Sequence, residues 1–427
     1  MNKVKLSIVS ALLLGTVSSL SAMQFQTVGY KSISMGGASV ANSSGSLSSY
    51  NNPALLAKSK YDVEISVSGG ASYYDHGAGA SMKSLQDTGF IDSMDRATND
   101  TANITQSDID NIYAGKDVIL GMDGDAVSIQ PQASVGFQIG SFGFGVYGTS
   151  DAVVTAKVSQ AHDKMILEDT ANPGNYIEVL ADGTTAASNI GAYQASSMEY
   201  ALNNGLTYAD VQGIGVVEVP LSYGHALSSS VGTFYVGGSL KYMQATTYTE
   251  KLKIDNTGNS ATKNDKTSNG FGVDLGFAYE PKIIKDMTIG LVAKNLNSPS
   301  FDTVSGTQVV IDPMVRVGIA YDIFESLEFA ADFDVTSNKT FIADLDNQMI
   351  GGGLAYHPAS WFSLRGGLMQ NMAANDKSGL VYTAGLGFGL KWFQIDLSAQ
   401  MASQSSTVNG TTYPQEGKVN LALVSRW

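Results

Sequence analysis

The residue types that carry most enzyme chemistry are sparse in this sequence. It contains no cysteine and only four histidines, His76, His162, His225 and His357. None of these histidines has the spacing of a metal-binding motif, no serine stands in a nucleophile-elbow motif, and the glycines form no phosphate-binding loop. We therefore expect neither an enzyme nor a site for a metal or another cofactor.

Charged residues instead recur on one side of segments in which apolar and polar residues alternate. Leu327 and Phe329, for example, flank Glu328. Such a period of two is typical of β-strands, whose successive side chains point to opposite faces. Nine charged residues are expected on the polar faces: Lys241, Asp274, Lys294, Arg316, Glu328, Asp332, Asp334, Arg365 and Asp396. They would form either a polar or proton path or, as is usual for buried charges, a charge-paired lining.

The elements that must position these side chains are about fourteen predicted strands. Each is bounded by Gly, Asn, Asp or Ser. Their ranges are 61–73, 126–139, 142–157, 214–226, 232–252, 268–280, 287–297, 309–322, 326–337, 347–357, 361–371, 379–391, 393–403 and 417–427. Because long and short connections alternate along the chain, all long connections would meet at one end of the sheet.

This asymmetry is typical of outer-membrane barrels, which have an even strand count, short periplasmic turns and long outer loops. Lipid cannot hydrogen-bond an exposed backbone, so a membrane-spanning sheet must close on itself. We therefore expect an all-β protein in which residues 61–427 form a transmembrane antiparallel β-barrel of about 14 strands. Long extracellular loops are expected near 74–125 and 158–213, and the nine charged residues would face the lumen.

The N-terminus has the pattern of a secretory signal peptide over residues 1–22. Lys3 and Lys5 precede a short apolar core, and small residues lead to a cleavage site after Ala22. The apolar run is too short for a membrane anchor. Loss of the two lysines takes the formal charge from −14 to −16, and such a surface repels nucleic acid.

Aromatic residues near the predicted strand ends would form interfacial girdles. They are Tyr73, Tyr74, Tyr279, Tyr321, Tyr356, Trp361, Phe362, Trp392, Phe393 and Trp427. The last strand ends in Trp427, which resembles the C-terminal signal by which the outer-membrane barrel-assembly machinery recognises its substrates. A chance Trp at the end of a β protein is the alternative.

The stretch "SISMGGASVANSSGSLSSYNNPALLA", residues 32–57, resembles the plug-forming start of the FadL-like superfamily of outer-membrane barrels. In that family a Met-Gly-Gly-Ala-like turn precedes an Asn-Pro-Ala motif and the first strand. "NPALLA", "LVAKNLNSPSF" (291–301) and "RVGIAYD" (316–322) are most similar to the TraF-type branch, named after a plasmid-transfer operon, with PorV-like and TodX-like relatives. The resemblance covers nearly the whole chain after the signal peptide.

The resemblance implies that residues 23–60 fold inside the barrel as a hatch, although a simple linker to the first strand is the alternative. The hatch or gate residues carried over are Gly36, Gly37, Ala38, Asn52, Pro53 and Ala54. Two glycines allow a tight turn, and Pro53 biases Asn52 towards extended backbone.

FadL-like relatives admit fatty-acid-like hydrophobic or amphipathic compounds, so the resemblance implies uptake of such a small-molecule ligand through the outer membrane. The rival function is a non-transporting scaffold or envelope component of secretion or conjugative transfer. A diffusion porin for polar solutes is disfavoured, because the hatch would block it.

Two features of the predicted loops leave alternatives open. Residues 75–125 hold ten Asp against Lys83, Arg96 and Lys116, which indicates a solvated acidic loop or one that binds lipopolysaccharide through divalent cations. Segments 83–97 and 195–212 have weak amphipathic helix patterns. Because some outer-membrane barrels are Ser-His lipid hydrolases, His225 or His357 near a serine keeps that reading open.

Overall fold

The structure is a computed structural model. It describes residues 26–99, 104–169, 172–253, 264–304, 306–340, 342, 345–390 and 392–427. The predicted signal peptide, residues 1–22, lies outside the described residues, as do the first three residues of the predicted hatch.

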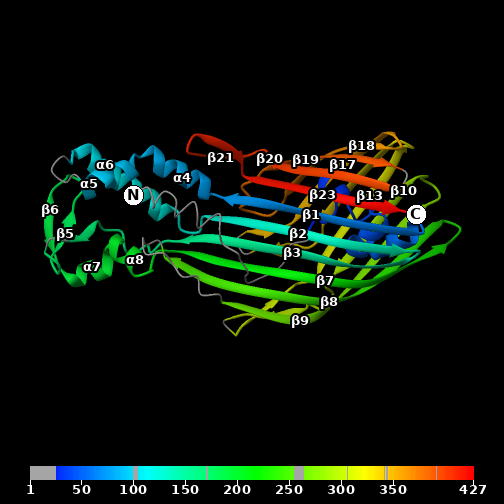
Figure 1. The fold of residues 1–427 in the computed structure, drawn as a ribbon, viewed down its shortest axis with the longest axis horizontal. Helices are drawn as coiled ribbons and strands as arrows, with labels where there is room; N and C mark the ends of the chain where they lie inside the picture. Colours follow the sequence, from blue (N-terminus) through cyan, green and yellow to red (C-terminus); the bar gives the residue numbers. More distant parts are fainter. Residues whose placement is uncertain are drawn as a thin grey trace.

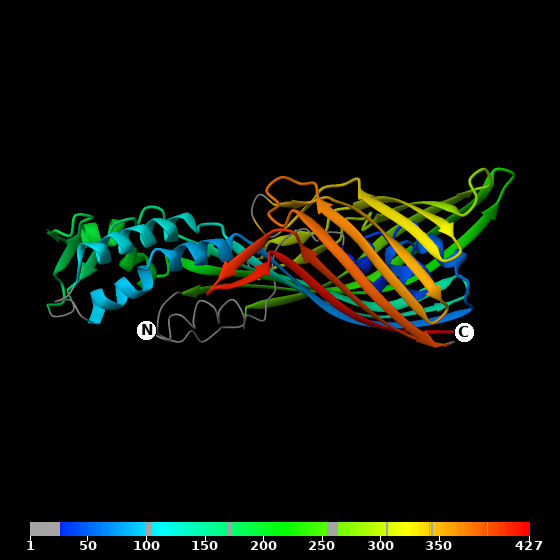
Figure 2. The same cartoon turned by 90° about the horizontal axis from the view of Figure 1, so that it is seen from above.

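Fourteen strands form a closed antiparallel barrel (Figures 1 and 2). In barrel order they are β1 (Val63–His76), β2 (Ala126–Ile139), β3 (Phe142–Lys157), β7 (Tyr208–Ser228), β8 (Gly232–Lys253), β9 (Asp265–Pro281), β10 (Met287–Lys294), β13 (Met314–Phe324), β14 (Leu327–Asp334), β17 (Met349–Ala359), β18 (Phe362–Asn371), β19 (Leu380–Leu390), β20 (Phe393–Ala402) and β23 (Glu416–Arg426). The first and last strands pair from Glu64–Arg426 to Tyr74–Glu416, which closes the cylinder. The predicted fold class, an all-β barrel of about 14 strands, is confirmed.

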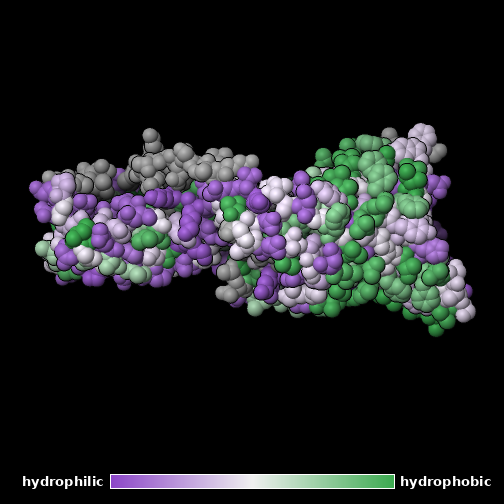
Figure 3. Space-filling view, turned by 90° about the horizontal axis from the view of Figure 1, so that it is seen from below, coloured by the Kyte–Doolittle hydropathy of each residue, from purple (hydrophilic) through white to green (hydrophobic). Residues whose placement is uncertain are grey.

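The strand pleat separates an apolar outer face from a polar inner one. Leu421 in β23 is 52% exposed, whereas its neighbour Asn420 is 2% exposed. Figure 3 shows apolar side chains gathered over the barrel half of the molecule and polar ones over the other half. A closed sheet with such an outer band is the architecture of outer-membrane proteins.

No helix in the described part of the chain is long and apolar enough to cross a membrane.

The aromatic residues divide between the two faces. Trp361, Trp392 and Trp427 are exposed, as expected of a girdle. The expectation was wrong for Tyr74, which is only partly exposed and alternates with the buried residues Ser72 and His76 on the inner face of β1. Its hydroxyl group bonds to Asp376 inside the fold. Tyr73 lies on the opposite face of the strand, and its hydroxyl group donates to the Pro414 carbonyl. Position near a strand end therefore did not decide which face carries the ring.

Two long connections build a structure that we call the helical extension, residues 77–125 and 158–207. Its elements are α4 (Ala78–Asp87), α5 (Phe90–Asn99), α6 (Gln106–Gly121), β4 (Ile166–Glu168), β5 (Tyr176–Val179), β6 (Thr185–Ser188), α7 (Ile190–Ser196) and α8 (Met198–Asn203). It projects from one end of the barrel, and the C-terminus lies at the other end (Figure 1).

The predicted loops therefore differ from the structure in their limits and their content. The barrel strands reach into both, because β1 continues to His76 and β7 begins at Tyr208. Helices α4 and α5 overlap the predicted 83–97. Helix α8 lies within the predicted 195–212, whereas residues 208–212 are strand, because they pair with the end of β3.

Three small hairpins interrupt other connections. They are β11 (Ser300–Asp302) with β12 (Gln308–Val310), β15 (Asn338–Lys339) with β16 (Asp346–Asn347), and β21 (Ser405–Val408) with β22 (Thr411–Pro414). The first changes the predicted strand 309–322, which begins only at Met314. Val309 and Ile311 do not join the outer face but pack in a buried cluster with Val40.

Residues 26–58 lie inside the barrel, and we call them the plug. Their ordered parts are short helical turns, namely α2 (Tyr30–Ser34), η1 (Gly45–Leu47), α3 (Ser48–Asn51) and η2 (Pro53–Lys58). Figure 2 shows them, in blue, within the strands of the barrel. Most plug residues are buried, so the plug fills much of the lumen.

Helix α6 was not predicted, although its first turn carries a signal. Thr105 caps the helix, accepting a hydrogen bond from the Asp108 backbone N–H, while the Asp108 carboxylate accepts from the Thr105 N–H at 3.0 Å. This capping box satisfies backbone donors that a helix start leaves open. Arg96 of α5 donates from Nε to Asp108 Oδ1 at 2.7 Å, which ties the two helices together.

The pKa of Asp108 makes the helical extension sensitive to acid. The Arg96 guanidinium, followed by the Thr105 N–H and hydroxyl, holds this pKa well below its usual range. A depressed folded-state pKa stabilises the fold above the unfolded pKa of about 3.9, and the stabilisation is lost as pH falls through the folded value. We expect hydrogen exchange of α6 amides, corrected for intrinsic rates, to accelerate from about pH 5 to about pH 2.

In the variant Asp108→Asn this exchange should be faster at neutral pH and should lose that acid dependence. Asp110→Asn is the matched control, because Asp110 is exposed on the same helix and bonds only to Gln106 in its own turn. Equal profiles for the two variants would contradict the assignment.

Candidate functional site: the plug and its lumen cavity

The Met-Gly-Gly-Ala turn fits where only glycine can. Gly36 has φ +63°, and a Cβ there would lie 2.3 Å from the Leu368 carbonyl oxygen and 2.5 Å from that of Gly352. Its N–H donates to Thr383 Oγ1 at 3.0 Å. Gly37 also has a positive φ, of +85°. The turn therefore brings plug backbone directly against the wall strands β17 and β18.

Ala38, the third residue carried over from the family resemblance, is fully buried. It packs with Met35, Ala41 and the wall residues Ala320 and Ala330. Small apolar side chains on both sides let the plug approach the wall closely here.

The Asn-Pro-Ala motif is a clamp between plug and wall. Asn52 Oδ1 accepts from the Ala54 N–H at 3.2 Å, which caps η2, and Pro53 is the first residue of that turn. Asn52 Nδ2 donates to the carbonyl oxygens of Val40 at 2.7 Å and Phe277 at 3.2 Å. One side chain thus joins two plug segments and strand β9.

Wall glycines make room for this clamp. A Cβ on Gly276 would meet Asn52 Oδ1 at 2.1 Å, and one on Gly237 would meet the Ala54 nitrogen at 2.4 Å. Further glycines lie on the lumen side of β17 and β19. Those at 351, 353 and 385 face plug atoms, whereas those at 387 and 389 face wall side chains.

Wall carboxylates accept hydrogen bonds from plug backbone. Asp332 Oδ2 accepts from the N–H groups of Ser39 at 2.7 Å and Val40 at 3.0 Å. Glu64 Oε1 accepts from the Ser46 N–H at 2.9 Å. Since these plug residues belong to no long helix or sheet, wall side chains supply the partners that secondary structure would otherwise provide.

The seam between β1 and β23 is bonded to the plug on both sides. Arg426 of β23 donates from Nε to Glu64 of β1 at 2.7 Å and from Nη2 to the Tyr30 hydroxyl at 2.8 Å. Glu64 also holds Ser46 of the plug. Glu64 and Arg426 were not among the predicted lumen residues, although strand alternation places both on the inner face.

Most of the predicted lumen charges form compact ionic groups. Lys241 Nζ lies 3.0 Å from Glu218 Oε2 and 3.1 Å from Asp274 Oδ1. Lys294 Nζ lies 3.3 Å from the centre of the Tyr50 ring of the plug, a cation–π contact.

Two further wall pairs involve arginines. The Arg316 guanidinium contacts both Asp334 oxygens, at 2.5 and 3.0 Å, and Arg365 lies 2.7 Å from Asp396. All four side chains are at most 3% exposed. With these contacts the geometry favours a charge-paired lining over an open proton path.

Ion pairs also join the plug to the wall directly. Lys31 Nζ lies 2.8 Å from Glu328 Oε2, and Lys58 Nζ lies 2.6 Å from Glu280 Oε1. The second pair is about one third exposed, so its contribution to stability is small.

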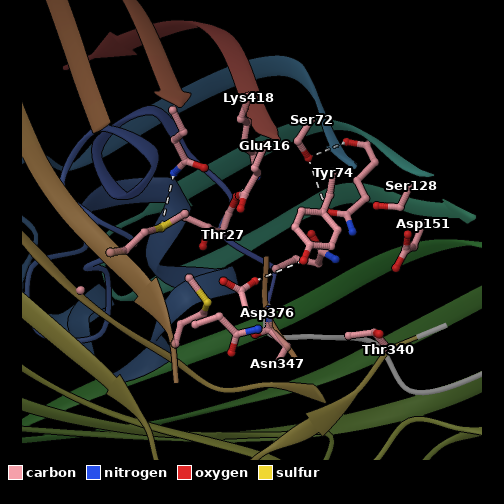
Figure 4. A pocket seen from close by; sticks show the side chains of 18 of the residues that line it. Thr27, Ser72, Tyr74, Ser128, Asp151, Thr340, Asn347, Asp376, Glu416 and Lys418 are labelled. Carbon is pink, nitrogen blue, oxygen red and sulfur yellow. Dashed lines mark hydrogen bonds between the residues drawn. The ribbon is translucent and has the colours of Figure 1, made fainter. Parts of the chain in front are cut away.

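A cavity of about 100 Å³ lies between the plug and the wall (Figure 4). It is reached by the ends of β1, β2 and β23 that lie towards the helical extension. Its lining mixes polar and apolar side chains. The polar ones include Ser72, Ser128, Gln130, Asp151, Glu416 and Lys418, and the apolar ones include Val153, Ile342, Leu345, Met349 and Met369. These residues share no motif in the sequence that would have marked them as a group.

Asp151 lines this cavity where the pairing of β2 with β3 is interrupted. The pairing of β2 with β3 runs from Ile129–Ala152 to Gln132–Thr149 and skips the two steps between. Pro131 lies in the skipped part and has no backbone N–H to donate. Asp151 is 8% exposed, and its Oδ1 has no hydrogen-bond partner.

The comparisons with known proteins agree with this architecture. The family described as "F plasmid transfer operon, TraF, protein" matches residues 49–334. This confirms the resemblance to the TraF-type branch. A search of the curated proteins gave no match.

Among solved structures, CymD, described as a monoaromatic hydrocarbon channel, is 12% identical with a TM-score of 0.50, over 95% of this chain and 99% of that chain. The Ralstonia pickettii toluene transporter TbuX is 14% identical with a TM-score of 0.49, over 95% and 99%. A Pseudomonas aeruginosa FadL homologue is 12% identical with a TM-score of 0.48, over 96% and 99%. At such identities the likeness to CymD concerns the fold alone.

Substitution of Gly36 should unseat the plug. Alanine there would adopt a left-handed backbone, at a cost of about 1–2 kcal/mol, and its Cβ would overlap wall carbonyls. We expect Gly36→Ala to increase hydrogen exchange across the plug. Gly148→Ala is the control, because a Cβ there would meet its nearest atom at an ordinary 3.7 Å. Unchanged exchange in Gly36→Ala would contradict the tight seat.

Removing one partner should lower the unfolding free energy more for the buried ion pair than for the exposed one. Arg316→Met leaves the Asp334 charge buried without its guanidinium, which we expect to cost about 3–5 kcal/mol of unfolding free energy. Lys58→Met, the control, should cost at most about 1 kcal/mol. Urea unfolding of the barrel in detergent, followed by heat-modifiable gel migration, measures both. Similar losses would mean that burial of the Arg316–Asp334 pair does not set its energy.

Proposed function

We propose, from the premise that this chain belongs to the TraF family of the F plasmid transfer operon, that it is a plug-gated outer-membrane channel for small amphipathic molecules. The observation that carries the proposal is the cavity between the plug and the wall. A plug-gated channel needs a cavity that admits the ligand and, beside it, a plug that can then move to open the lumen. The gate residues are Gly36, Gly37, Ala38, Asn52, Pro53 and Ala54.

The lining of the cavity supports the substrate class. The lining offers hydroxyl, amide and charged groups together with Val153 and two methionines. Ligand sites usually combine an apolar surface with a few polar groups that fix orientation. CymD, which has a similar fold, is described as a channel for monoaromatic hydrocarbons. A compound with an apolar part and a polar head matches this lining better than a pure hydrocarbon.

The orientation follows from the loops. With the short turns in the periplasm, both mature termini are periplasmic and the helical extension is extracellular, where it meets lipopolysaccharide. The barrel-assembly machinery would recognise the last strand through Trp427. Export by the predicted signal peptide precedes this step.

A non-transporting envelope component is the second candidate. The helical extension favours it, because five helices and a small sheet reach far beyond the barrel (Figure 1). Channel loops need no such length, whereas a scaffold for a protein partner does. A stoichiometric protein that co-purifies with the barrel and leaves when residues 77–125 are replaced by a short linker would favour this candidate.

Deletion of the plug tests the channel directly. We expect a variant that lacks residues 26–58 to conduct ions in planar bilayers at least about tenfold better than the full chain, because the deletion removes the segment that fills the lumen. Gly148→Ala is the control for handling and insertion. Unchanged conductance in a variant that still shows heat-modifiable migration would sink the channel proposal.

A further inference from the structure

We infer that the lumen cavity selects amphipathic molecules whose polar head is a primary ammonium group, held by Asp151 and the hydroxyls beside it. This inference rests on the proposed channel function and names its substrate class. The same cavity would repel a molecule whose head group is a carboxylate.

Asp151 provides the anchor. It comes from β3, is more than nine-tenths buried, and lines the cavity with an Oδ1 atom that makes no hydrogen bond. A buried carboxylate oxygen without a partner is costly, so it marks a place where a donor is missing. Figure 4 shows Ser72, Tyr74 and Ser128 on the same side of the cavity. An ammonium group has three donors and no acceptor, which suits this set of oxygens.

The ionisable residues that line the cavity also favour a cationic ligand. Four carboxylates line the cavity, those of Asp151, Asp332, Asp376 and Glu416, against the cations Arg316 and Lys418. Arg316 is engaged by Asp334, and Lys418 donates to the Thr27 carbonyl of the plug at 3.1 Å. The lining therefore holds more carboxylates than cations, an imbalance that a cationic head group would reduce.

The apolar residues of the lining determine which tail the ligand can have. Val153 follows Asp151 by two residues, so both side chains leave the same face of β3. Met349 and Met369 line the cavity from β17 and β18. Methionine side chains adapt to irregular apolar shapes, so a short alkyl or aryl tail fits better than a polar one.

The test uses the full chain purified in detergent and three probes with the same tail, namely n-hexylamine, n-hexanol and hexanoate. Isothermal titration calorimetry at neutral pH compares their affinities. We expect n-hexylamine to bind at least about tenfold more tightly than n-hexanol, because charge-assisted hydrogen bonds are roughly twice as strong as neutral ones. Hexanoate should bind most weakly.

The variant Asp151→Asn should lose at least about tenfold in n-hexylamine affinity and change little for n-hexanol. Asp117→Asn is the matched control, because Asp117 is a 73% exposed carboxylate on α6 outside the barrel. Heat-modifiable migration checks that each variant is folded. The comparison among the three probes in the unchanged chain needs no variant, so it tests the inference even if Asp151→Asn does not fold.

Two failures can be told apart. Equal affinities for n-hexylamine and n-hexanol, or preference for hexanoate, would overturn the ammonium assignment while the channel proposal stands. Conductance that plug deletion leaves unchanged would overturn the channel itself, and n-hexylamine binding would then describe a closed site.

Discussion

An irregular backbone enclosed in a narrow barrel needs a hydrogen-bond partner for each of its peptide groups, and this need organises the interior of the protein. The plug has only short helical turns, so it cannot satisfy its own backbone. Asp332 and Glu64 accept from its N–H groups, while Ser398 and Gln400 donate to its carbonyls at 2.9 Å each. The polar inner face of the strands is therefore the second half of the plug structure.

The same need explains the glycines and the ion pairs of the wall. Plug backbone can reach side chains such as Thr383 only where the strands carry no Cβ, as at Gly351 and Gly367. The charges of the wall are also neutralised locally, as in the Arg365–Asp396 pair, whose guanidinium lies 5.0 Å from the centre of the Tyr30 ring of the plug. This matching is incomplete at several buried atoms, and one of them lies in the cavity, where Asp151 retains an oxygen without a partner.

The barrel was predictable because apolar and polar residues alternate along each strand and so identify its two faces. Long and short connections also alternate along the chain. The predicted limits of β2 and β3 agree with the structure to the residue. The inner charges were predictable for the same reason. Their partners were not, because partners such as Lys31 and Glu328 lie almost three hundred residues apart.

Other features lacked a usable signal in the sequence alone. Helix α6 has an almost even distribution of apolar residues around its axis. The Thr105–Asp108 capping box is therefore the one sequence feature described above that indicates it. Val309 and Ile311 continue the alternation of the next strand, yet a hairpin carries them into the lumen. Tyr74 stands where a girdle residue would stand, but its ring faces inward. For Val309, Ile311 and Tyr74 the deciding contacts are made by residues distant in sequence.

The seam between β1 and β23 has a consequence for the order of assembly. Glu64 and Arg426 lie on the first and last strands of the cylinder, and they bond both to each other and to Ser46 and Tyr30. During synthesis the plug emerges before every barrel strand, and β23 emerges after the other thirteen. The plug cannot complete its bonds until the final strand arrives, so seating of the earliest segment and closure of the sheet become one cooperative step.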